Sequence, residues 1–184
     1  IINNIGINRE TPDWMIKRLE SSGFKSNNII VDITNYVMLE TGQPLHAYDL
    51  SKIDSKIKVR RGYNNEKITL LDETVKKVNK TFLLITDNSK ALGIAGIMGG
   101  QHSGISADTE NIVLESACFN HKTIMGRSRM LNLHTESGLR FERGVDPLIQ
   151  KHAIERATQL INEYSDGQNG PISIKQDDES IPLK

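Results

Sequence analysis

The chain has a single cysteine, Cys118, among its 184 residues. One cysteine cannot form an internal disulfide, and it cannot supply a cysteine-based zinc cluster. The five histidines stand far apart in the sequence, and no His-Glu-x-x-His motif pairs two of them. The sequence therefore predicts no metal site, and a cytoplasmic setting fits a chain with so few thiols.

An excess of charge of either sign is also missing, because Lys and Arg together number 23 and Asp and Glu together number 23. Affinity for phosphate grows with the number of Lys and Arg contacts, so zero net charge argues against strong unaided binding to nucleic acid or to an anionic membrane. No apolar run approaches the roughly 18–20 residues of a membrane-spanning helix. The chain starts without methionine or a signal peptide, and we expect it to be a piece of a longer protein.

Apolar spacing and turn residues predict the order of helices and strands. We expect helices from Thr11, as the capping residue, to Gly23 and over 28–41 and 147–164, a further helix beginning at His121, and strands over 56–61 (an edge strand), 67–71, 82–86, 91–97 and 111–114. This order predicts an α+β fold with mixed or antiparallel sheets flanked by helices. The expected domain covers residues 11–164, with a linker or tail over 1–10 and a connection to a following domain over 165–184.

The helix predicted over 28–41 has polar residues on its apolar face. Thr34 and Asn35 interrupt that face, Gly42 ends the helix, and His46 follows in the expected exit loop. These three side chains either form a small polar site or hydrogen-bond locally. Polar groups near loops often bond to nearby backbone, so the residues alone favour the local interpretation.

Two further segments combine small residues with polar ones. The glycines of segment 95–100 permit positive φ and close approach of the backbone to a ligand, but a tight turn is the simpler interpretation, and no phosphate-binding motif is complete. Glu115 ends an apolar strand, where it is either solvated or buried against a hydrogen-bond donor. Cys118, between Ala117 and Phe119, is expected to pack in the core.

A fourth segment, 134–147, is dense in polar groups. Its charged residues Arg140, Glu142, Arg143 and Asp146 either form an exposed network of little energetic consequence or brace the loop that holds Thr135.

Taken together, these segments resemble the editing domain of the bacterial phenylalanyl-tRNA synthetase beta subunit. The motifs Asp-Ile-Thr-Asn-Tyr-Val (32–37), Gly-Gln-Pro-Leu-His-Ala (42–47), Gly-Ile-Met-Gly-Gly (96–100) and Arg-Phe-Glu-Arg-Gly-Val-Asp-Pro (140–147) occur in the family's order. The resemblance covers about residues 11–164 and implies hydrolysis of the ester of tyrosine wrongly attached to tRNA(Phe). A pocket built for phenylalanine rejects one added hydroxyl by only roughly 10²-fold, whereas a second site that binds this hydroxyl prefers tyrosine.

The resemblance also implies roles for individual residues. Glu115 accepts the tyrosine hydroxyl, Gly99 allows close backbone approach, Thr135 and Ser137 shape the wall, and Thr34, Asn35 and His46 lie near the ester and the attacking water. His46 acts either as general base or by orienting water or the terminal ribose. No cofactor is expected in this domain, although the whole enzyme uses ATP and Mg²⁺. The expected partners are the tyrosine-carrying 3′ end of tRNA(Phe) and the alpha subunit of an α2β2 synthetase, without a membrane.

One departure from the family pattern lies in the segment Thr135-Glu136-Ser137-Gly138, where we expect Thr-Asp/Glu-Ala-Ser. Ser137 adds a hydroxyl to the pocket wall, which bears on the strength of editing. A non-catalytic module that binds an amino acid or docks tRNA, with editing lost, is therefore the alternative. A general nucleic-acid-binding domain is a weaker third interpretation, because the net charge is zero.

Overall fold

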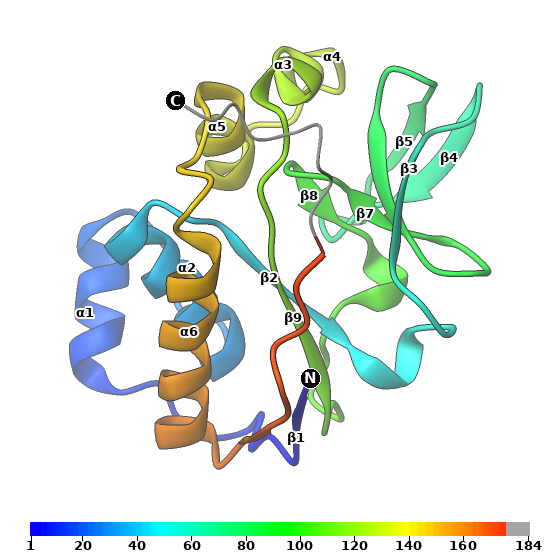
Figure 1. Cartoon of the computed structure of the whole chain (residues 1–184). Coiled ribbons are helices and arrows are strands. Elements are labelled where there is room, and N and C mark those ends of the chain that lie inside the picture. Colours follow the sequence, from blue (N-terminus) through cyan, green and yellow to red (C-terminus); the bar gives the residue numbers. More distant parts are fainter. Residues whose placement is uncertain (176–184) are drawn as a thin grey trace.

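The computed structural model describes residues 1–175 (Figure 1). The strands are β1 (Ile2–Asn3), β2 (Leu45–Asp49), β3 (Lys58–Arg61), β4 (Glu66–Thr69), β5 (Val75–Val78), β6 (Leu83–Thr86), β7 (Ala91–Ile94), β8 (Met98–Gly99), β9 (Ile112–Ser116) and β10 (Gln168–Asn169). The α-helices are α1 (Asp13–Ser21), α2 (Ile29–Thr41), α3 (His121–Ile124), α4 (Arg127–Met130), α5 (Glu136–Arg143) and α6 (Gln150–Ser165), with 3-10 turns η1 (Leu50–Lys52) and η2 (Gln101–Ser103). The paired strands in this range are all antiparallel, which confirms the predicted α+β class.

The first layer is a sheet of order β10-β1-β9-β2 with α1, α2 and α6 packed beside it (Figure 1). Ile33, Leu114 and Leu160 bring α2, β9 and α6 into one buried cluster. The Asn28 side chain accepts hydrogen bonds from the first amides of α2, and Gly42 ends the helix at φ +78°. The helix predicted over 28–41 is therefore confirmed within one residue.

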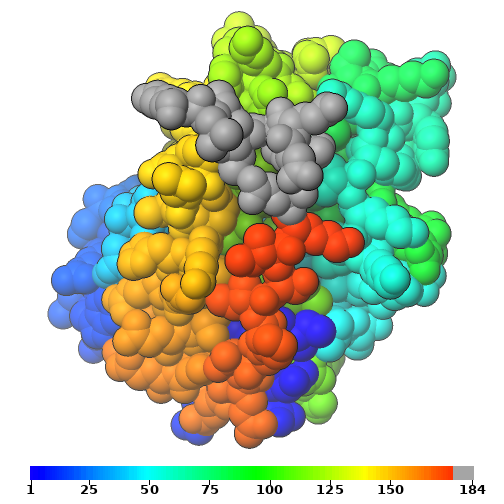
Figure 2. Space-filling model, viewed as in Figure 1, coloured from blue at the N-terminus to red at the C-terminus, as the bar shows by residue number. Residues whose placement is uncertain are grey.

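The first ten residues belong to the fold, contrary to the prediction of a linker or tail. Ile2 pairs with Ile112 of β9 and with Asn169 of β10, and Figure 2 shows the N-terminal surface beside the orange-red C-terminal segment. Ile2, Ile5 and Ile7 are buried in the core of the first layer. The strand was not predicted because its buried isoleucines are separated by polar residues and glycine, with no regular alternation. Of the predicted connection over 165–184, residues 176–184 lie outside the described range, and the earlier part includes β10.

The start of α1 also differs from the prediction. The N-cap position is Pro12, and the Thr11 hydroxyl donates to the Asp32 carboxylate at 2.6 Å instead of capping the helix. Asp32 is fully buried and also accepts from the Ser26 hydroxyl and the Asn27 amide. This buried carboxylate thereby joins α2 to the segments on either side of α1.

The second layer is a sheet of order β3-β6-β7-β8, accompanied by the hairpin β4-β5. The predicted edge strand is confirmed as β3, which pairs with β6 alone among the described strands. Ile68, Phe82, Ile124 and Phe141 join this layer to α3 and α5 in a second buried cluster. β7 ends at Ile94, and the chain turns through Gly96 into β8.

Two helical regions differ from the prediction. The segment expected to be a loop around Thr135 contains α5, because the Thr135 side chain accepts from the Gly138 amide and caps the helix. The helix expected from His121 is divided into α3 and α4 by Gly126, whose φ is +74°. The longest described helix, α6, has 16 residues, and no helix within residues 1–175 combines the length and apolarity needed to cross a bilayer.

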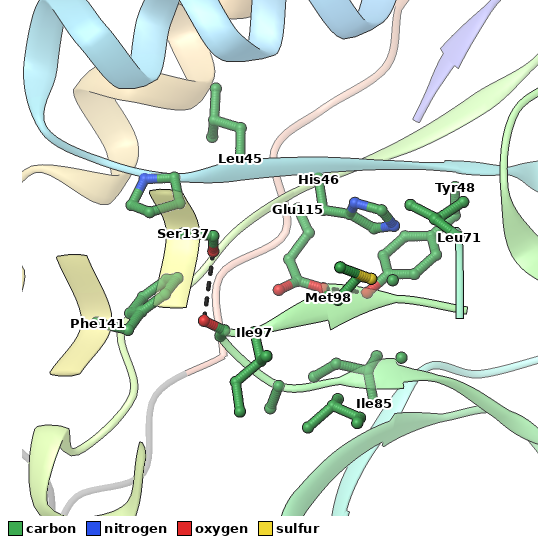
Figure 3. A pocket seen from close by; sticks show the side chains of 16 residues that line it. Leu45, His46, Tyr48, Leu71, Ile85, Ile97, Met98, Glu115, Ser137 and Phe141 are labelled. Carbon is green, nitrogen blue, oxygen red and sulfur yellow. Dashed lines mark hydrogen bonds between the residues drawn. The ribbon is translucent and has the colours of Figure 1, made fainter. Parts of the chain in front are cut away.

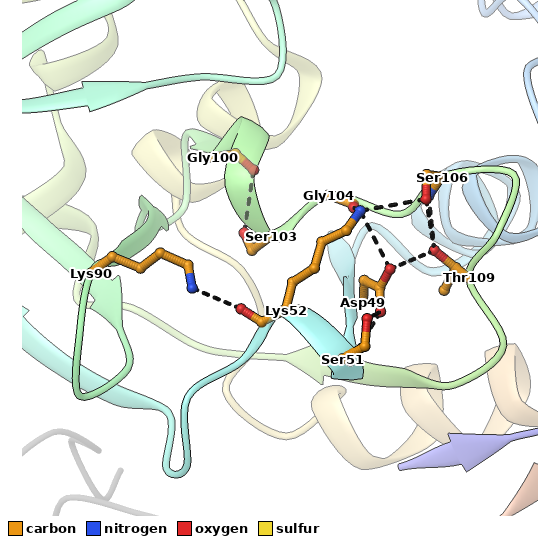
Figure 4. A network of polar contacts seen from close by, with 9 residues as sticks. All are labelled: Asp49, Ser51, Lys52, Lys90, Gly100, Ser103, Gly104, Ser106 and Thr109. Atoms are coloured by element: carbon orange, nitrogen blue, oxygen red, sulfur yellow. Dashed lines mark hydrogen bonds and ion pairs between the residues drawn. The ribbon is translucent and has the colours of Figure 1, made fainter.

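A buried polar network fixes the end of β2 to the loop that follows β8 (Figure 4). Asp49, which is 3% exposed, accepts from the Ser51 hydroxyl at 2.6 Å and from the Thr109 hydroxyl at 2.8 Å. Lys52 Nζ lies 3.3 Å from the Asp49 carboxylate and donates to the Gly104 carbonyl oxygen. Gly104 and Thr109 lie in the connection between η2 and β9, so the network ties the end of β2 to the segment that leads from the second sheet back to the first.

Candidate functional site

A cavity of about 190 Å³ lies where the two sheets face each other (Figure 3). Its lining comes from β2 and β9 on one side and from β6, β7, β8, α5 and the turn between β4 and β5 on the other: Pro44, Leu45, His46, Tyr48, Leu71, Ile85, Gly93, Ile94, Ala95, Gly96, Ile97, Met98, Gly99, Glu115, Ser137 and Phe141. The walls are mostly apolar, with a few polar side chains that converge. A cavity of this kind is typical of a small-ligand site.

His46 lies on β2 rather than in the loop expected after α2. It stands directly opposite Glu115 of β9, and its ring meets the Tyr48 ring edge-on at 4.5 Å. Burial disfavours the charged imidazolium and lowers the pKa of His46 to about 4. Its Nε2 atom is buried and has no hydrogen-bond partner among the described residues. At pH 7 His46 is thus a neutral imidazole with one ring nitrogen free to bind a ligand or water.

Glu115 faces the cavity, so the interpretation as a solvated strand-end carboxylate is wrong. Burial raises its pKa, and a hydrogen bond from the Tyr48 hydroxyl partly opposes that shift. The Tyr48 oxygen lies 2.6 Å from Oε2 of Glu115. Burial and the neighbouring Glu115 carboxylate also raise the pKa of Tyr48, so Tyr48 stays protonated as the donor. The second carboxylate oxygen, Oε1, accepts no hydrogen bond from the described residues.

Gly99 brings the backbone of β8 against the His46 ring. A Cβ atom at this position would lie 2.4 Å from Cε1 and 2.5 Å from Nε2 of His46, which is closer than real contacts allow. Both interpretations of the glycine segment 95–100, a tight turn and a close approach of the backbone, therefore apply to different glycines. Gly96 forms the turn with φ +69°, while Gly99 permits a close approach to a catalytic candidate.

Ser137 and Phe141 close the cavity from α5. The Ser137 hydroxyl donates to the Gly96 carbonyl oxygen at 3.4 Å (Figure 3). Thr135 does not line the cavity. Its hydroxyl donates to the Ile97 carbonyl oxygen at 2.9 Å and caps α5, so Thr135 places Ser137 against the wall.

Thr34 and Asn35 also lie outside the cavity lining. The Thr34 hydroxyl donates to the Val31 carbonyl oxygen within α2 at 2.8 Å, which is the local bonding that the residues alone favoured. The structure thus brings together His46, Gly99 and Glu115 with Ser137. The roles implied for Thr34 and Asn35 stay predictions from the resemblance.

Two residues with positioning roles were missed in the sequence. Tyr48 orients Glu115, and it could have been found from its place two residues after His46 on one face of a strand. Gln43, which is fully buried, donates to the Pro44 and Ala117 carbonyl oxygens. Its own amide oxygen accepts from Gln150, so it joins β2, β9 and α6 beside the cavity.

The polar groups of the cavity suit acid–base and hydrogen-bond chemistry. Within residues 1–175, no three His, Cys, Asp or Glu side chains are arranged to hold a metal ion. Cys118 is exposed, so the prediction that it packs in the core is wrong, because the chain after β9 leaves the sheet at this point. A neutral imidazole and a carboxylate in an apolar cavity can bind a polar-tipped aromatic group and activate a water molecule.

Comparison with known proteins places the chain in a family. A model of the B3/4 domain matches residues 1–166. The chain is 50% identical over 182 residues to the phenylalanine–tRNA ligase beta subunit of Aliivibrio fischeri and 50% identical over 177 residues to that of Francisella tularensis. These matches cover 99% and 96% of this chain but only 23% and 22% of those proteins, so the chain spans less than a quarter of their length.

Among solved structures, the chain is similar to an N-terminal fragment of the phenylalanyl-tRNA synthetase beta-subunit from Pyrococcus horikoshii. The TM-score is 0.45 at 14% identity, over 78% of this chain and 45% of that chain. The family model, by contrast, covers most of the sequence and both halves of the cavity. The chain belongs to the B3/4 domain family.

Proposed function

We propose that this chain is the editing module of a phenylalanine–tRNA ligase beta subunit, and that it hydrolyses the ester of tyrosine attached to tRNA(Phe). One observation carries the proposal: the unpartnered Nε2 of His46 and the carboxylate of Glu115 share one largely apolar cavity. The names of its relatives support the proposal.

Glu115 supplies the preference for tyrosine. Tyr48 occupies one oxygen of this carboxylate, and the other is available to a second phenol, that of the substrate. Apolar side chains such as Ile97, Met98 and Phe141 pack around an aromatic ring. A phenylalanine ring leaves the second oxygen buried without a donor, which costs about 1–3 kcal/mol. That cost corresponds to roughly five- to 150-fold discrimination.

His46 supplies the hydrolytic step. Its neutral Nε2 accepts a hydrogen bond from water, and it either removes that proton as the water attacks or only holds the water in line with the ester carbonyl. The water oxygen forms a bond to the carbonyl carbon, and the bond from that carbon to the ribose oxygen breaks. The proton passes to the ribose oxygen, so the products are free tyrosine and tRNA.

The proposed function also implies a substrate, a partner subunit and a location. The module acts on the tyrosine-carrying 3′ end of tRNA(Phe), within a beta subunit assembled with an alpha subunit in the cytoplasm. ATP and Mg²⁺ serve the ligase reaction elsewhere in that enzyme. In the alternative function, a non-catalytic binding module, the same cavity binds tyrosine but does not cleave the ester.

The decisive experiment is deacylation of tyrosyl-tRNA(Phe) and phenylalanyl-tRNA(Phe) by the complete synthetase that contains this chain. We expect faster loss of tyrosine, abolished by Glu115→Ala and His46→Ala. Glu163→Ala and His152→Ala, both exposed on α6, are matched controls. Tyrosine binding without hydrolysis above the spontaneous rate supports the non-catalytic alternative, and equal rates for the two esters contradict the role of Glu115.

A further inference from the structure

The charges of this neutral chain are unevenly distributed. Residues 56–80 contain eight Lys and Arg against three Asp and Glu, and residues 121–143 contain five against two. These segments therefore have net charges of +5 and +3, while the rest of the chain has a net charge of −8. Zero net charge of the whole chain conceals a strongly basic region.

The two basic segments are packed against each other. Arg61 of β3 and Arg127 of α4 both donate to the Thr81 carbonyl oxygen, at 3.3 and 3.1 Å. Ile68 of β4 and Ile124 of α3 belong to the same buried cluster. β3, the β4-β5 hairpin and α3-α4 accordingly form one side of the molecule (Figure 1), which we call the basic face.

The basic face borders the cavity. Leu71, at the tip of the β4-β5 hairpin, is 49% exposed and lines the cavity, and its amide donates to the Gly99 carbonyl oxygen at 3.1 Å. From the other basic segment, Ser137 and Phe141 line the opposite wall. A molecule that enters beside Leu71 therefore passes between the two basic segments.

Like charges are held together on the basic face without compensation. Lys67 of β4 stands directly opposite Lys77 of β5, a pairing that destabilises a free hairpin. Arg61 and Arg127 meet at one carbonyl oxygen. None of these four side chains forms an ion pair with an acid in the described part of the chain. A polyanion laid across this face relieves both repulsions.

Two acids of the basic face are already engaged. Glu66 is paired with Arg60 at 2.7 Å, and Asp72 accepts from the Thr74 hydroxyl. Beside them, Tyr63 is 62% exposed, and the Arg60 guanidinium lies 4.2 Å from its ring centroid. Arg60 itself is paired, but the same segment carries the unpaired Lys67 and Lys77. An exposed aromatic ring in a segment with unpaired cations is suited to binding single-stranded nucleic acid by stacking and by charge.

We propose that the basic face binds the phosphate backbone of the RNA whose 3′ end enters the cavity. This inference rests on the proposed function, which it deepens by assigning the surface that receives the RNA. The Lys67–Lys77 pair and the Arg61–Arg127 pair contact phosphates, and Tyr63 offers a stacking surface for a base.

The test compares two substrates in the complete synthetase: tyrosyl-tRNA(Phe), and the tyrosyl ester of adenosine, which has no phosphate. The variant is Lys67→Glu with Lys77→Glu. Its matched control is Lys17→Glu with Lys25→Glu, which makes the same charge change at exposed positions away from the basic face. We expect about tenfold lower kcat/KM on the tRNA substrate and less than about twofold change on the adenosine ester. The slope of log kcat/KM against log salt concentration also becomes shallower, by about 0.7 for each phosphate that the variant no longer neutralises.

Equal reductions on both substrates overturn the proposal, because they reveal a disturbed fold instead of weakened RNA binding. An unchanged rate on tyrosyl-tRNA overturns it as well, and leaves an acidic protein segment as the occupant of this face. If the unmodified enzyme cleaves neither ester, the proposed function fails separately. In that case, the affinity for tRNA(Phe) carrying amide-linked tyrosine tests whether the basic face binds the RNA. A tenfold weaker affinity of the variant supports binding at this face, and equal affinity in variant and control rejects it.

Discussion

Tyr48 donates a 2.6 Å hydrogen bond to Glu115 across the pairing of β2 with β9. The protein's own phenol thereby occupies one oxygen of the carboxylate that we propose to recognise the phenol of the substrate. This bond fixes the orientation of the Glu115 side chain and favours its ionised form, against the effect of burial. In the proposed function, recognition of the tyrosine substrate therefore depends on Tyr48 of the site.

Replacing Tyr48 by Phe tests this positioning role. Without its donor, Glu115 becomes easier to protonate and less fixed, because the Tyr48 hydrogen bond lowers the Glu115 pKa. We expect the preference for tyrosyl over phenylalanyl ester to fall by roughly three- to tenfold. The acid side of the pH–rate profile for tyrosyl ester also shifts to higher pH. Tyr164→Phe, on α6, is the matched control, and an unchanged preference in Tyr48→Phe contradicts the role.

Replacing Glu115 by Gln is expected to raise stability while it removes specificity. Folding raises the pKa of the Glu115 carboxyl, so the folded protein loses stability as pH rises above the carboxyl's unfolded pKa of about 4.3. The uncharged Gln avoids that loss and keeps an oxygen for Tyr48. Urea unfolding of the variant and the unmodified protein at pH 4 and pH 8 measures the effect. We expect the Glu115→Gln variant to be more stable than the unmodified protein at pH 8 but not at pH 4. Glu163→Gln, the control, should change neither the stability at pH 8 nor the preference for tyrosyl ester.

His46 is expected to remain active well below the ordinary histidine range. Because burial lowers its pKa to about 4, the neutral imidazole persists between pH 5 and 7. NMR titration of the His46 ring in the Glu115→Gln variant isolates this proton, since residue 115 then has no proton to exchange. We expect a midpoint near pH 4, and a midpoint near pH 6.5 contradicts a buried His46. The same shift makes folding stability fall as pH drops from about 6.5 to 4, because the unfolded state takes up the proton first.

The sequence predicted those parts of the fold that depend on local signals. Asn28 and Gly42 mark the ends of α2 as expected, and the alternation in residues 56–61 predicted the edge strand observed as β3. β2 was missed because a strand that follows Gly42-Gln-Pro has only five residues, among them His46 and Asp49. The helix α5 was missed because Ser137 and Gly138 are poor helix formers, and only the Thr135 cap and tertiary contacts define it.

The composition of the site could not follow from sequence spacing. His46 and Glu115 meet through the register of β2 with β9, between strands far apart in the chain, and no local pattern specifies that register. The family resemblance named His46, Glu115, Gly99 and Ser137, which the structure brings together. It also named Thr34, Asn35 and Thr135, which the structure leaves outside the lining. The direction of a side chain on α2 is set by how the helix packs in the core, and this packing involves residues from the whole chain.

Replacing Gly99 by Ala should block the site with little effect on the rest of the fold. The added Cβ meets Cε1 and Nε2 of His46 at 2.4 and 2.5 Å, so the imidazole must turn out of the cavity or β8 must move. Such overpacking costs about 1–3 kcal/mol of stability. We expect hydrolysis to fall at least about 100-fold, because displacing a catalytic group by roughly 1 Å has an effect of that size. Gly170→Ala, where a Cβ meets only the Ile1 carbonyl oxygen at 3.6 Å, is the matched control for both unfolding and activity. If Gly99→Ala retains full hydrolysis, His46 does not act from the position that the structure gives it.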